Sequence, residues 1–332
     1  MLMNRVLVVR GGAIGDFILT LPALKALRDA YPDARIEILG YKHIAVLAEN
    51  RFYAQAVRSI EYGPLSRLFA KNSELPAELA DYFATFDLII SYLYDPDGIF
   101  ESNLRRSGVE NLLCGPAKIV KTGDHAAWQL ARPIEELGIR VVDLTEKIFL
   151  SEEDRQFGRE FLQTLSQPII AIHPGSGSKE KNWPLQNWIE LFSREHWHVE
   201  KRPSLIVISG EADKAQTAQL EHTWKDQNIR FAKNLPLPHL AGVLEHSIFI
   251  GHDSGISHLA AAAGANCILL FGPTDPNVWA PRNENVEVLR ARNGNINDLE
   301  IALVQAALTE ALHAGSKSVN QGLQQDVEFL SP

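Results

Sequence analysis

Cysteine and long apolar runs are both scarce in this 332-residue sequence. Its two cysteines, Cys114 and Cys267, are too few for a disulfide framework and lack the spacing of metal ligands. A reducing, cytoplasmic environment fits that composition. No apolar run approaches the ~18 residues that span a bilayer, and the first residues lead directly into an apolar strand rather than a signal peptide. Any membrane contact is therefore expected to be peripheral.

An excess of positive charge is also absent. With 32 Lys and Arg against 41 Asp and Glu, the formal net charge is −9, which argues against a general nucleic-acid-binding protein. The histidines show no H-E-x-x-H or comparable metal spacing, and the lack of a Walker lysine motif excludes a P-loop NTPase. What remains is the composition of a soluble globular protein that is long enough for two domains.

The order of strands and helices indicates an α/β protein. The β-branched run Val6–Val9 predicts a strand buried on both faces, followed by a glycine-rich turn, a helix over Leu21–Ala30 and a strand over Ile36–Leu39. This start is typical of a parallel sheet. Further strands are expected at Val57–Ile60, Leu88–Tyr92, Lys118–Val120, Ile169–His173, Leu205–Ser209, Ser247–Ile250 and Cys267–Phe271. Helices are expected at Ser151–Leu165, Pro184–His196, Glu211–Trp224, Pro238–His246, Gly255–Ala263 and Asp298–His313, with a mixed loop and helix at Gly63–Pro76.

Two consecutive series of this kind predict two doubly wound, Rossmann-like domains that face each other across a cleft holding the site. We expect the first domain at residues 1–165, ended by the helix Ser151–Leu165, and the second at residues 166–315. A polar and loosely structured tail is expected at residues 316–332.

The segment GHDSGISHLA, which begins at Gly251, carries the most chemical information. It predicts a tight turn and a helix that begins at Gly255 and is capped by the Ser254 hydroxyl. The open N–H groups and the positive end of the helix dipole suit a phosphate. Asp253 and His258 add a carboxylate and an imidazole, although a lone histidine at such a place more often packs or caps a helix.

The segment RGGAIGD follows the first predicted strand. A dinucleotide fingerprint, G-x-G-x-x-G, fits Gly12 and Gly15 but places its first glycine at Arg10, while Glu37 stands where a ribose-binding acid would be. The glycines otherwise permit a tight turn. Asp16 lies beyond the carboxyl end of the strand, where α/β proteins bind ligands, and either caps a helix or accepts a proton from a sugar hydroxyl.

Two later loops offer further ligand contacts. The loop HPGSGS, which contains Ser176, presents N–H and O–H donors to phosphate oxygens, and Lys181 adds a positive charge. The alternative is an ordinary turn before a helix that begins near Pro184. Glu211, after another strand, suits ribose hydroxyls, although an acid in a first helical turn also compensates the helix dipole.

Two weaker patterns lie in the first half of the chain. Asp95 and Asp97 form a D-x-D pattern like that of metal sites, but Asp-Pro-Asp-Gly is also favourable turn chemistry, and the turn is the favoured interpretation. A locally basic stretch comprises Arg105, Arg106, Lys118 and Lys121. It forms either a solvated face or a contact for an anionic acceptor.

Together these segments resemble the ADP-heptose:lipopolysaccharide heptosyltransferases, the family-nine glycosyltransferases. The resemblance rests on GD followed by LTLPAL at Gly15–Leu24, on HPGS with KNWP at His173–Pro184, and on DSGISHLA with LFGPT at Asp253–Thr274. The ordered set extends over nearly the whole chain. One departure is Ser254, which stands where threonine is expected and preserves the helix cap.

The resemblance implies a GT-B fold, in which the N-terminal domain receives an anionic lipid-linked glycan and the C-terminal domain holds the nucleotide-sugar. It implies inverting transfer without a metal or other cofactor, with ADP-heptose or a related donor as co-substrate, at the cytoplasmic face of the inner membrane. Asp16 would be the catalytic base, on an acceptor-side loop with Gly12 and Gly15. The donor diphosphate would contact Ser176, Lys181, Ser254, Gly255 and His258, with Glu211 at the ribose and Asp253 at the sugar.

Other activities stay open on the residues alone. A sugar-nucleotide epimerase of similar fold or an NAD-dependent dehydrogenase would use the same glycine-rich turn, although Arg10 weighs against NAD. A non-catalytic nucleotide-sugar binding protein would keep the phosphate site without the base.

Overall fold

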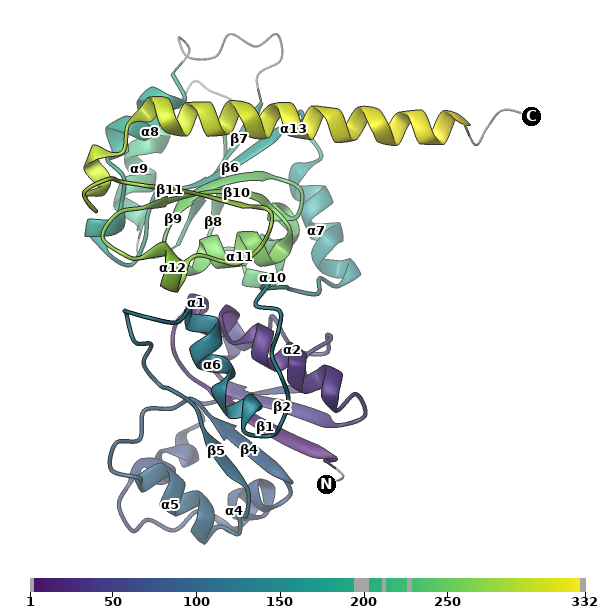
Figure 1. The fold of residues 1–332 in the computed structure, drawn as a ribbon, viewed down its shortest axis with the longest axis vertical. Helices are drawn as coiled ribbons and strands as arrows, with labels where there is room; N and C mark the ends of the chain where they lie inside the picture. The colour runs from purple at the N-terminus through teal and green to yellow at the C-terminus, as the bar shows by residue number, and fades with distance from the viewer. Residues whose placement is uncertain (1–2, 194–202, 211–212, 226–228, 329–332) are drawn as a thin grey trace. The chain divides into compact units, whose positions relative to one another are not determined.

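Two parallel β-sheets organise the chain (Figure 1). The computed structural model describes residues 3–193, 203–210, 213–225 and 229–328, and side chains up to residue 314. The contacts divide the chain into two units. Unit 1 comprises Met1–Glu152 with Pro236–Pro238 and Asn277–Asn283, and unit 2 comprises Glu153–Leu235, His239–Pro276 and Glu284–Pro332.

Unit 1 is built on a five-stranded parallel sheet of order β3-β2-β1-β4-β5. Its elements are β1 (Arg5–Arg10), α1 (Ile14–Ile18), α2 (Leu21–Ala30), β2 (Arg35–Gly40), α3 (Lys42–Ala45), β3 (Ala56–Ser59), the 3-10 helix η1 (Gly63–Phe69), α4 (Ala77–Ala84), β4 (Leu88–Ser91), α5 (Ile99–Arg106), β5 (Leu112–Cys114) and α6 (Ala126–Glu135). The central β1 is apolar and wholly buried over Val6–Val9, as expected for a strand that is covered on both faces.

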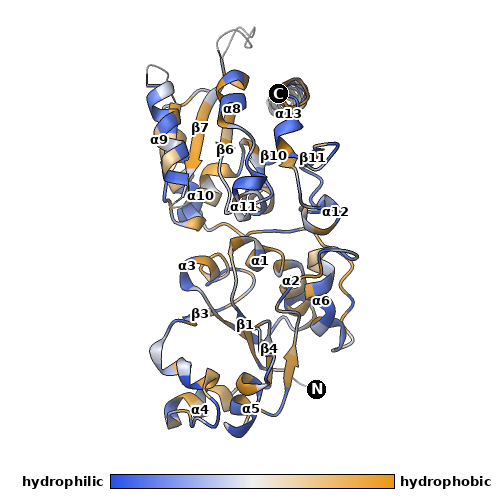
Figure 2. Ribbon diagram, turned by 90° about the vertical axis from the view of Figure 1, so that its left-hand side faces the viewer, coloured by the Kyte–Doolittle hydropathy of each residue, from blue (hydrophilic) through white to orange (hydrophobic). Residues whose placement is uncertain are grey.

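Helices cover the sheet of unit 1 through a continuous apolar core. Leu7 and Val9 of β1 pack with Phe83 of α4 and with Phe100 and Leu104 of α5. Helices α2 and α6 pack against each other. The hydropathy colouring in Figure 2 shows apolar strands and helices with mixed faces, the pattern of a sheet enclosed by amphipathic helices.

Unit 2 is built on a six-stranded parallel sheet of order β11-β10-β9-β6-β7-β8. Its elements are α7 (Glu152–Leu162), β6 (Ile169–His173), the 3-10 helix η2 (Lys179–Lys181), α8 (Leu185–Leu191), β7 (Ser204–Ser209), α9 (Lys214–Thr223), β8 (Ile229–Lys233), α10 (Leu237–Leu244), β9 (Ile248–His252), α11 (Gly255–Ala263), β10 (Asn266–Phe271), α12 (Pro276–Trp279), β11 (Val286–Arg290), the 3-10 helix η5 (Ile296–Asp298) and α13 (Ile301–Glu328).

The core of unit 2 joins its central strands to α8, α9 and α13. Trp183 and Trp188 are almost completely buried there, with Leu220 of α9 and Val304 of α13. These two tryptophans therefore belong to the core. Because β6, β9 and β10 are central and parallel, the loops that follow them lie at one edge of the sheet.

The helix Ser151–Leu165 belongs to unit 2, not to the end of the first domain. A Cβ atom on Gly158 of α7 would lie 2.3 Å from the carbonyl oxygen of Gly242, so α7 and α10 cross backbone to backbone. Arg155 adds an ion pair to Glu245 at 2.9 Å. The expected boundary at residue 165 therefore falls after a helix that packs on α10 of unit 2.

Several predicted elements differ from those observed. No strand forms at Lys118–Val120, because β5 at Leu112–Cys114 pairs with β4 instead. The two edge strands β8 and β11 were not expected from the sequence. Helix α13 continues to Glu328, through most of the segment predicted to be a loose tail.

A short segment of the second half of the chain completes unit 1. His125, at the start of α6, contacts the carbonyl oxygen of Ala280 through Nε2 at 2.8 Å. Asn283 donates from Nδ2 to the carbonyl oxygen of Glu146 at 2.8 Å and accepts from the Glu146 N–H at 3.1 Å. Unit 1 is thus discontinuous in sequence.

Candidate functional site

Asp16 lies just beyond the carboxyl end of β1, in the third position of the short helix α1. Its Oδ2 accepts a hydrogen bond from the Ala13 N–H at 2.8 Å, and its side chain is 38% exposed. Asp16 is therefore not the N-cap of a long helix. The chain forms α1 and then a separate helix, α2, with Pro22 in its first turn. The Asp16 carboxylate is held by the Ala13 N–H and remains open to solvent.

Arg10 supplies a cation beside this carboxylate. Its guanidinium lies 3.7 Å from Asp16 Oδ1 and donates from Nε to Thr20 Oγ1 at 2.9 Å. Thr20 in turn donates to the Asp16 carbonyl oxygen at 2.8 Å. Burial lowers the pKa of Arg10, and the nearby Asp16 carboxylate partly opposes that shift. Arg10 fills the place that a dinucleotide fingerprint reserves for glycine, and its guanidinium is held by Asp16 and Thr20.

Gly12 is needed for the shape of this turn. Its φ is +94°, and a Cβ atom there would lie 2.7 Å from Asp16 Oδ2. Any larger residue would displace the carboxylate. Gly15 lies within α1, one residue before Asp16. The acceptor-side loop of the sequence prediction is therefore a turn shaped around Asp16.

Glu37 occupies no ligand-facing position. It pairs with Leu7 in the middle of β2 and is buried. Arg35 donates to Glu37 at 2.9 Å and Tyr82 donates at 3.1 Å. Burial raises the pKa of Glu37, but these hydrogen bonds and nearby arginine charges outweigh burial and lower it overall. The acid expected for an NAD ribose is thus committed to structural contacts.

In unit 2 the loop after β6 holds Ser176 by internal contacts. The Ser176 hydroxyl lies 2.8 Å from the carbonyl oxygen of Ser178 and 2.6 Å from Oδ1 of Asn182, and these two acceptors share its single O–H proton. The Ser178 N–H donates to Ser176 Oγ at 3.3 Å. Ser176 therefore shapes the loop directly, in addition to any ligand contact.

Lys181 and Asp253 follow two neighbouring strands of unit 2, β6 and β9, and form an ion pair. Lys181 Nζ donates to Asp253 Oδ2 at 2.7 Å, although the two residues are far apart in sequence. The Asp253 side chain is 8% exposed and that of Lys181 is 30% exposed. The ammonium group has three N–H donors, so one bond to Asp253 leaves two that can meet an anion. The sequence predicted both residues as donor contacts, but not their pairing.

Ser254 is the N-cap of α11, as predicted. Its Oγ accepts from the Ser257 N–H, and its backbone is extended at φ −151° and ψ 160°. Gly255 is the first residue of the helix, which leaves first-turn N–H groups without an intrahelical acceptor. His258 is buried among the other residues of α11, one turn from the cap. Unit 2 thus carries Lys181, Asp253 and the N-terminus of α11 at one edge of its sheet.

Sequence reasoning missed a buried polar cluster at the same edge. His173 Nε2 lies 2.9 Å from Asp213 Oδ2, and both side chains are buried. His252 accepts a hydrogen bond at Nε2 from the backbone N–H of Trp183, at 2.8 Å. His173 and His252 are the last residues of β6 and β9. A histidine at the end of each of these strands was therefore the sequence signal that could have revealed this cluster. Glu211, predicted at the ribose, lies outside the described residues.

The Asp95 and Asp97 pattern forms a turn and a helix cap, as favoured. The Asp95 carboxylate accepts from the N–H groups of Phe100 and Glu101 at 3.0 Å each. Its oxygens therefore satisfy the start of α5. Within the part of the chain that the structure describes, no group of three or more His, Cys, Asp or Glu side chains is placed to hold a metal ion.

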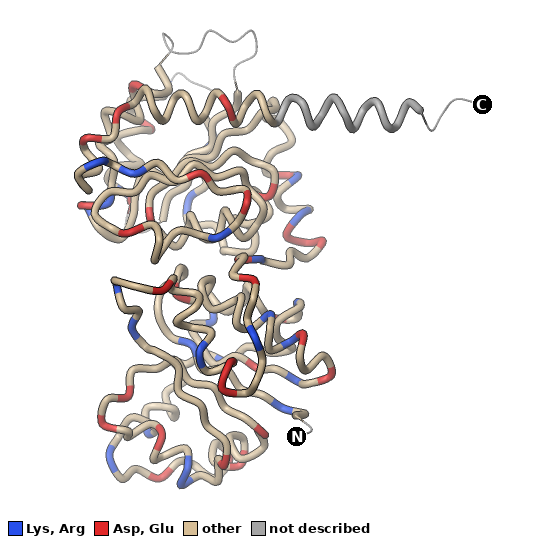
Figure 3. The backbone as a smooth tube through the Cα atoms, viewed as in Figure 1, with Lys and Arg blue, Asp and Glu red and all other residues tan. Residues whose placement is uncertain are grey.

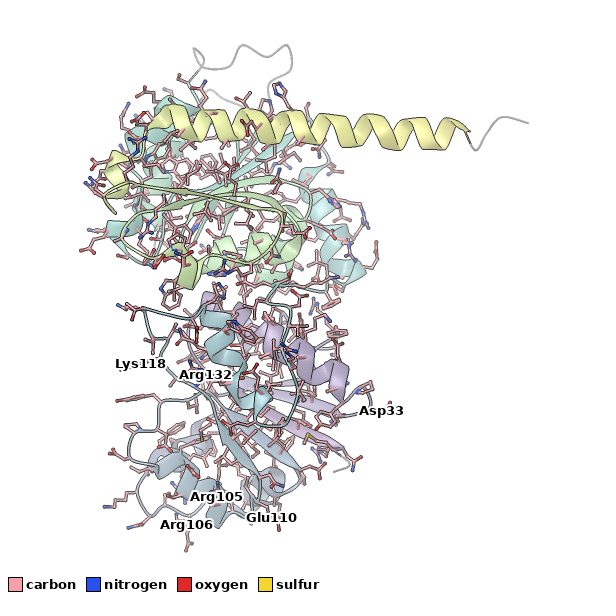
Figure 4. The ribbon with its side chains drawn as sticks, viewed as in Figure 1. Asp33, Arg105, Arg106, Glu110, Lys118 and Arg132 are labelled. Atoms are coloured by element: carbon pink, nitrogen blue, oxygen red, sulfur yellow. The ribbon has the colours of Figure 1, made fainter. Side chains whose placement is uncertain are left out.

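The locally basic stretch does not gather into one patch. Figure 4 draws Arg105 and Arg106 on α5 and Lys118 apart from them, on the loop after β5. Arg105 pairs with Glu101 at 2.8 Å, and Lys118 Nζ lies 4.5 Å from the centre of the Tyr94 ring. Acidic and basic residues are interspersed along both units (Figure 3). In the described part of the chain, no helix has the length and apolarity to cross a membrane.

Comparison with known families identifies the family to which the chain belongs. The family model for glycosyltransferase family 9 (heptosyltransferase) matches residues 125–305, more than half of the chain. The chain belongs to glycosyltransferase family 9. The match includes the loop of Lys181 and the start of α11.

Curated members of family 9 share low sequence identity with the chain. Lipopolysaccharide heptosyltransferase 3 of Escherichia coli is 23% identical over 300 residues, which cover 82% of this chain and 84% of the relative. Lipopolysaccharide heptosyltransferase 1 of Escherichia coli K12 is 24% identical over 342 residues, which cover 92% and 99%.

Solved structures of family 9 members share the fold. The ADP-heptose lipopolysaccharide heptosyltransferase II of Escherichia coli has a TM-score of 0.75 at 15% identity, covering 94% of this chain and 99% of that one. The family 9 structure from Veillonella parvula also has a TM-score of 0.75, at 18% identity, covering 94% and 98%. The predicted GT-B class, with two Rossmann-like α/β domains, is thereby confirmed.

Proposed function

We propose that this family 9 glycosyltransferase transfers a heptose, or a related sugar, from ADP-heptose to a lipopolysaccharide core or a similar anionic glycan. The observation that carries the proposal is the Lys181–Asp253 pair beside the capped N-terminus of α11. Relatives of the chain are lipopolysaccharide heptosyltransferases. A solved relative of Escherichia coli, with a TM-score of 0.67, was determined with ADP.

The donor half of the proposed site combines three kinds of contact. The N–H groups at the start of α11, from the N-cap Ser254 and the first helical residue Gly255, and the positive end of the helix dipole suit the donor diphosphate. Lys181 offers a partly exposed ammonium group to the same oxygens. Asp253, held by Lys181, presents its carboxylate to hydroxyls of the donor sugar. Glu211 stays proposed for the ribose, and Ser176 and His258 for the diphosphate surroundings.

The acceptor half rests on Asp16. Its carboxylate is exposed and held in place by the Ala13 N–H, which suits a group that must reach an acceptor hydroxyl. Arg10 is buried and fixed beside it, with its guanidinium 3.7 Å from Asp16 Oδ1. We assign Asp16 as the general base on this ground.

The proposed reaction is a single displacement with inversion. An oxygen lone pair of the acceptor hydroxyl forms a bond to the anomeric carbon while the bond from that carbon to the diphosphate oxygen breaks. Asp16 takes the hydroxyl proton, and ADP leaves with the electron pair. Lys181 and the N-terminus of α11 stabilise the charge that grows on the departing diphosphate. The proposal assigns no step to a metal ion, and a chelator added to the same assay tests that point.

The deciding experiment changes Asp16 and measures transfer and donor binding separately. Asp16→Asn keeps the size of the side chain but removes the base, so kcat should fall by about 10²–10⁴-fold, the usual contribution of general base catalysis. Binding of ADP, measured by calorimetry, should stay within about twofold because unit 2 carries the donor contacts.

Asp29→Asn is the matched control. Asp29 is an exposed carboxylate of α2 in the same unit, paired with Lys25 at 2.6 Å, and its replacement should leave kcat unchanged. Wild-type turnover in Asp16→Asn would contradict the base assignment. Binding of a donor without transfer to any glycan acceptor would instead favour a non-catalytic nucleotide-sugar binding protein.

A further inference from the structure

The loop of residues 174–182 in unit 2 carries Ser176 and Lys181 and is anchored by buried polar side chains at both ends. His173, the last residue of β6, lies immediately before the loop. Trp183 lies immediately after the loop, and its backbone N–H donates to His252 Nε2 at 2.8 Å. The backbone of the loop is therefore tied to the ends of two neighbouring strands, β6 and β9.

Asp213 holds His173, the residue that anchors the start of the loop. It stands at the N-cap position of α9, yet its side chain does not cap that helix. Its Oδ2 instead lies 2.9 Å from His173 Nε2, so the imidazole donates to it, and the Gly210 N–H donates to the same oxygen at 3.4 Å. Burial raises the pKa of Asp213, but the hydrogen bond and charge of His173 outweigh burial and lower it.

The same carboxylate sets the position of the loop backbone. A Cβ atom on Gly175 would lie 1.9 Å from Asp213 Oδ1, so the carboxylate packs directly against the bare Cα of Gly175. Asp213 is 3% exposed, and no water-filled space separates the two groups at that distance. The Asp213 side chain is thus in contact with the residue that precedes Ser176.

The cluster is costly to bury, which argues against a role in packing alone. Among the described side chains, Asp213 Oδ1 and His173 Nδ1 are buried without a hydrogen-bond partner. Unpaired polar atoms of this kind are rare in folded proteins, so each one calls for an explanation. An apolar side chain at position 213 would avoid that penalty, but it would lose the contact with His173.

We propose that Asp213 is a positioning residue for the donor diphosphate: held by His173, it fixes the Gly175–Ser176 backbone and so presents the loop and Lys181 to the phosphate oxygens. The inference rests on the proposed function, because it names how that donor site is held. Asp213 acts through the loop and does not itself touch the nucleotide.

Two variants of Asp213 in the full-length protein test the proposal. Asp213→Ala should raise the Kd for ADP by about tenfold, the scale of one lost charge-assisted contact. Asp213→Asn keeps an oxygen for His173 and should bind ADP within about threefold of the wild type. Hydrogen–deuterium exchange at residues 174–178, measured without nucleotide, should become faster in Asp213→Ala and stay near wild type in Asp213→Asn.

Asp154→Asn is the matched control, because Asp154 is a buried carboxylate of the same unit on α7. It should lower the Tm while leaving ADP binding and loop exchange unchanged. Unchanged ADP binding and loop exchange in Asp213→Ala would overturn the proposal, as would an Asn variant as impaired as the Ala variant. A wild-type protein that binds no nucleoside diphosphate would refute the donor assignment instead, and the exchange measurement would still decide whether Asp213 fixes the loop.

Discussion

At the scale of single residues, His252 links the donor side of unit 2 to pH. It is fully buried at the end of β9, between Trp183 and Trp188. Burial, reinforced by the charge of His173, lowers the pKa of His252 from 6.5 to about 3. The neighbouring Gly175 backbone and the carboxylates of Asp213 and Asp253 act in the opposite direction and do not compensate. The folded protein therefore keeps this imidazole neutral.

That shift predicts a loss of stability in weak acid. Between pH 6.5 and pH 3, the unfolded chain binds a proton at His252 that the folded chain does not, so lowering the pH favours unfolding. At pH 5 the contribution of this residue should be lower than at pH 7 by about 2 kcal/mol. His252→Gln, which keeps an acceptor for the Trp183 N–H, should remove that part of the pH dependence.

The measurement is urea unfolding at pH 7 and pH 5 for the wild type and the variant. Replacing the exposed His222 of α9 with Gln provides the control and should leave the pH dependence as it is in the wild type. Equal losses of unfolding free energy in the wild type and in His252→Gln would exclude His252 as the source.

Single residues also mark where sequence reasoning succeeds. The Ser254 cap follows from local chemistry, because a hydroxyl before a helix satisfies N–H groups one turn away. The Lys181–Asp253 pair depends on two strands lying side by side, so spacing along the chain gives no sign of it. Glu37 illustrates the opposite error, since an acid in a strand can face arginines rather than a ligand.

At the scale of elements, the crossing of α7 and α10 holds the first helix of unit 2 against a later one. The two helices approach so closely that a Cβ on Gly242 would lie 2.1 Å from the carbonyl oxygen of Asp154. Both contact surfaces are backbone, which cannot rotate away as a side chain can. The crossing therefore requires glycine at positions 158 and 242.

Gly158→Ala should force the two helices apart. We expect a loss of about 1–3 kcal/mol in the free energy of unfolding, the usual cost of overpacking a tight contact. Gly177→Ala is the control, because a Cβ there meets nothing within 4 Å. Thermal unfolding of both variants is the measurement, and an unchanged Tm in Gly158→Ala would contradict the close crossing.

The same scale shows which elements the sequence reveals. Central strands such as β6 and β10 are continuous apolar runs and were predicted within a residue of their ends. Strands β8 and β11 form the two edges of the sheet and alternate polar with apolar residues over short lengths. Residues Lys118–Val120 resemble such an edge strand, but the Val120 N–H donates to Gln129 rather than to a strand.

At the scale of the whole molecule, the chain leaves and re-enters unit 1. Pro236–Pro238 and Asn277–Asn283 belong to it although their neighbours in sequence belong to unit 2. A boundary drawn once along the sequence, at residue 165 or elsewhere, cannot reproduce that division. Local patterns do not reveal it, because it depends on contacts such as that of His125 with Ala280.

This discontinuity determines how the protein can be recombined with its relatives. A hybrid that takes only residues 1–152 from another member would place foreign partners against the native Ala280 and Asn283. A hybrid that takes residues 236–238 and 277–283 as well inherits the complete set of unit 1 segments. We expect the second design to have the higher Tm and to express better as folded protein. The folding of unit 1 should therefore depend on three separated stretches of sequence rather than on one.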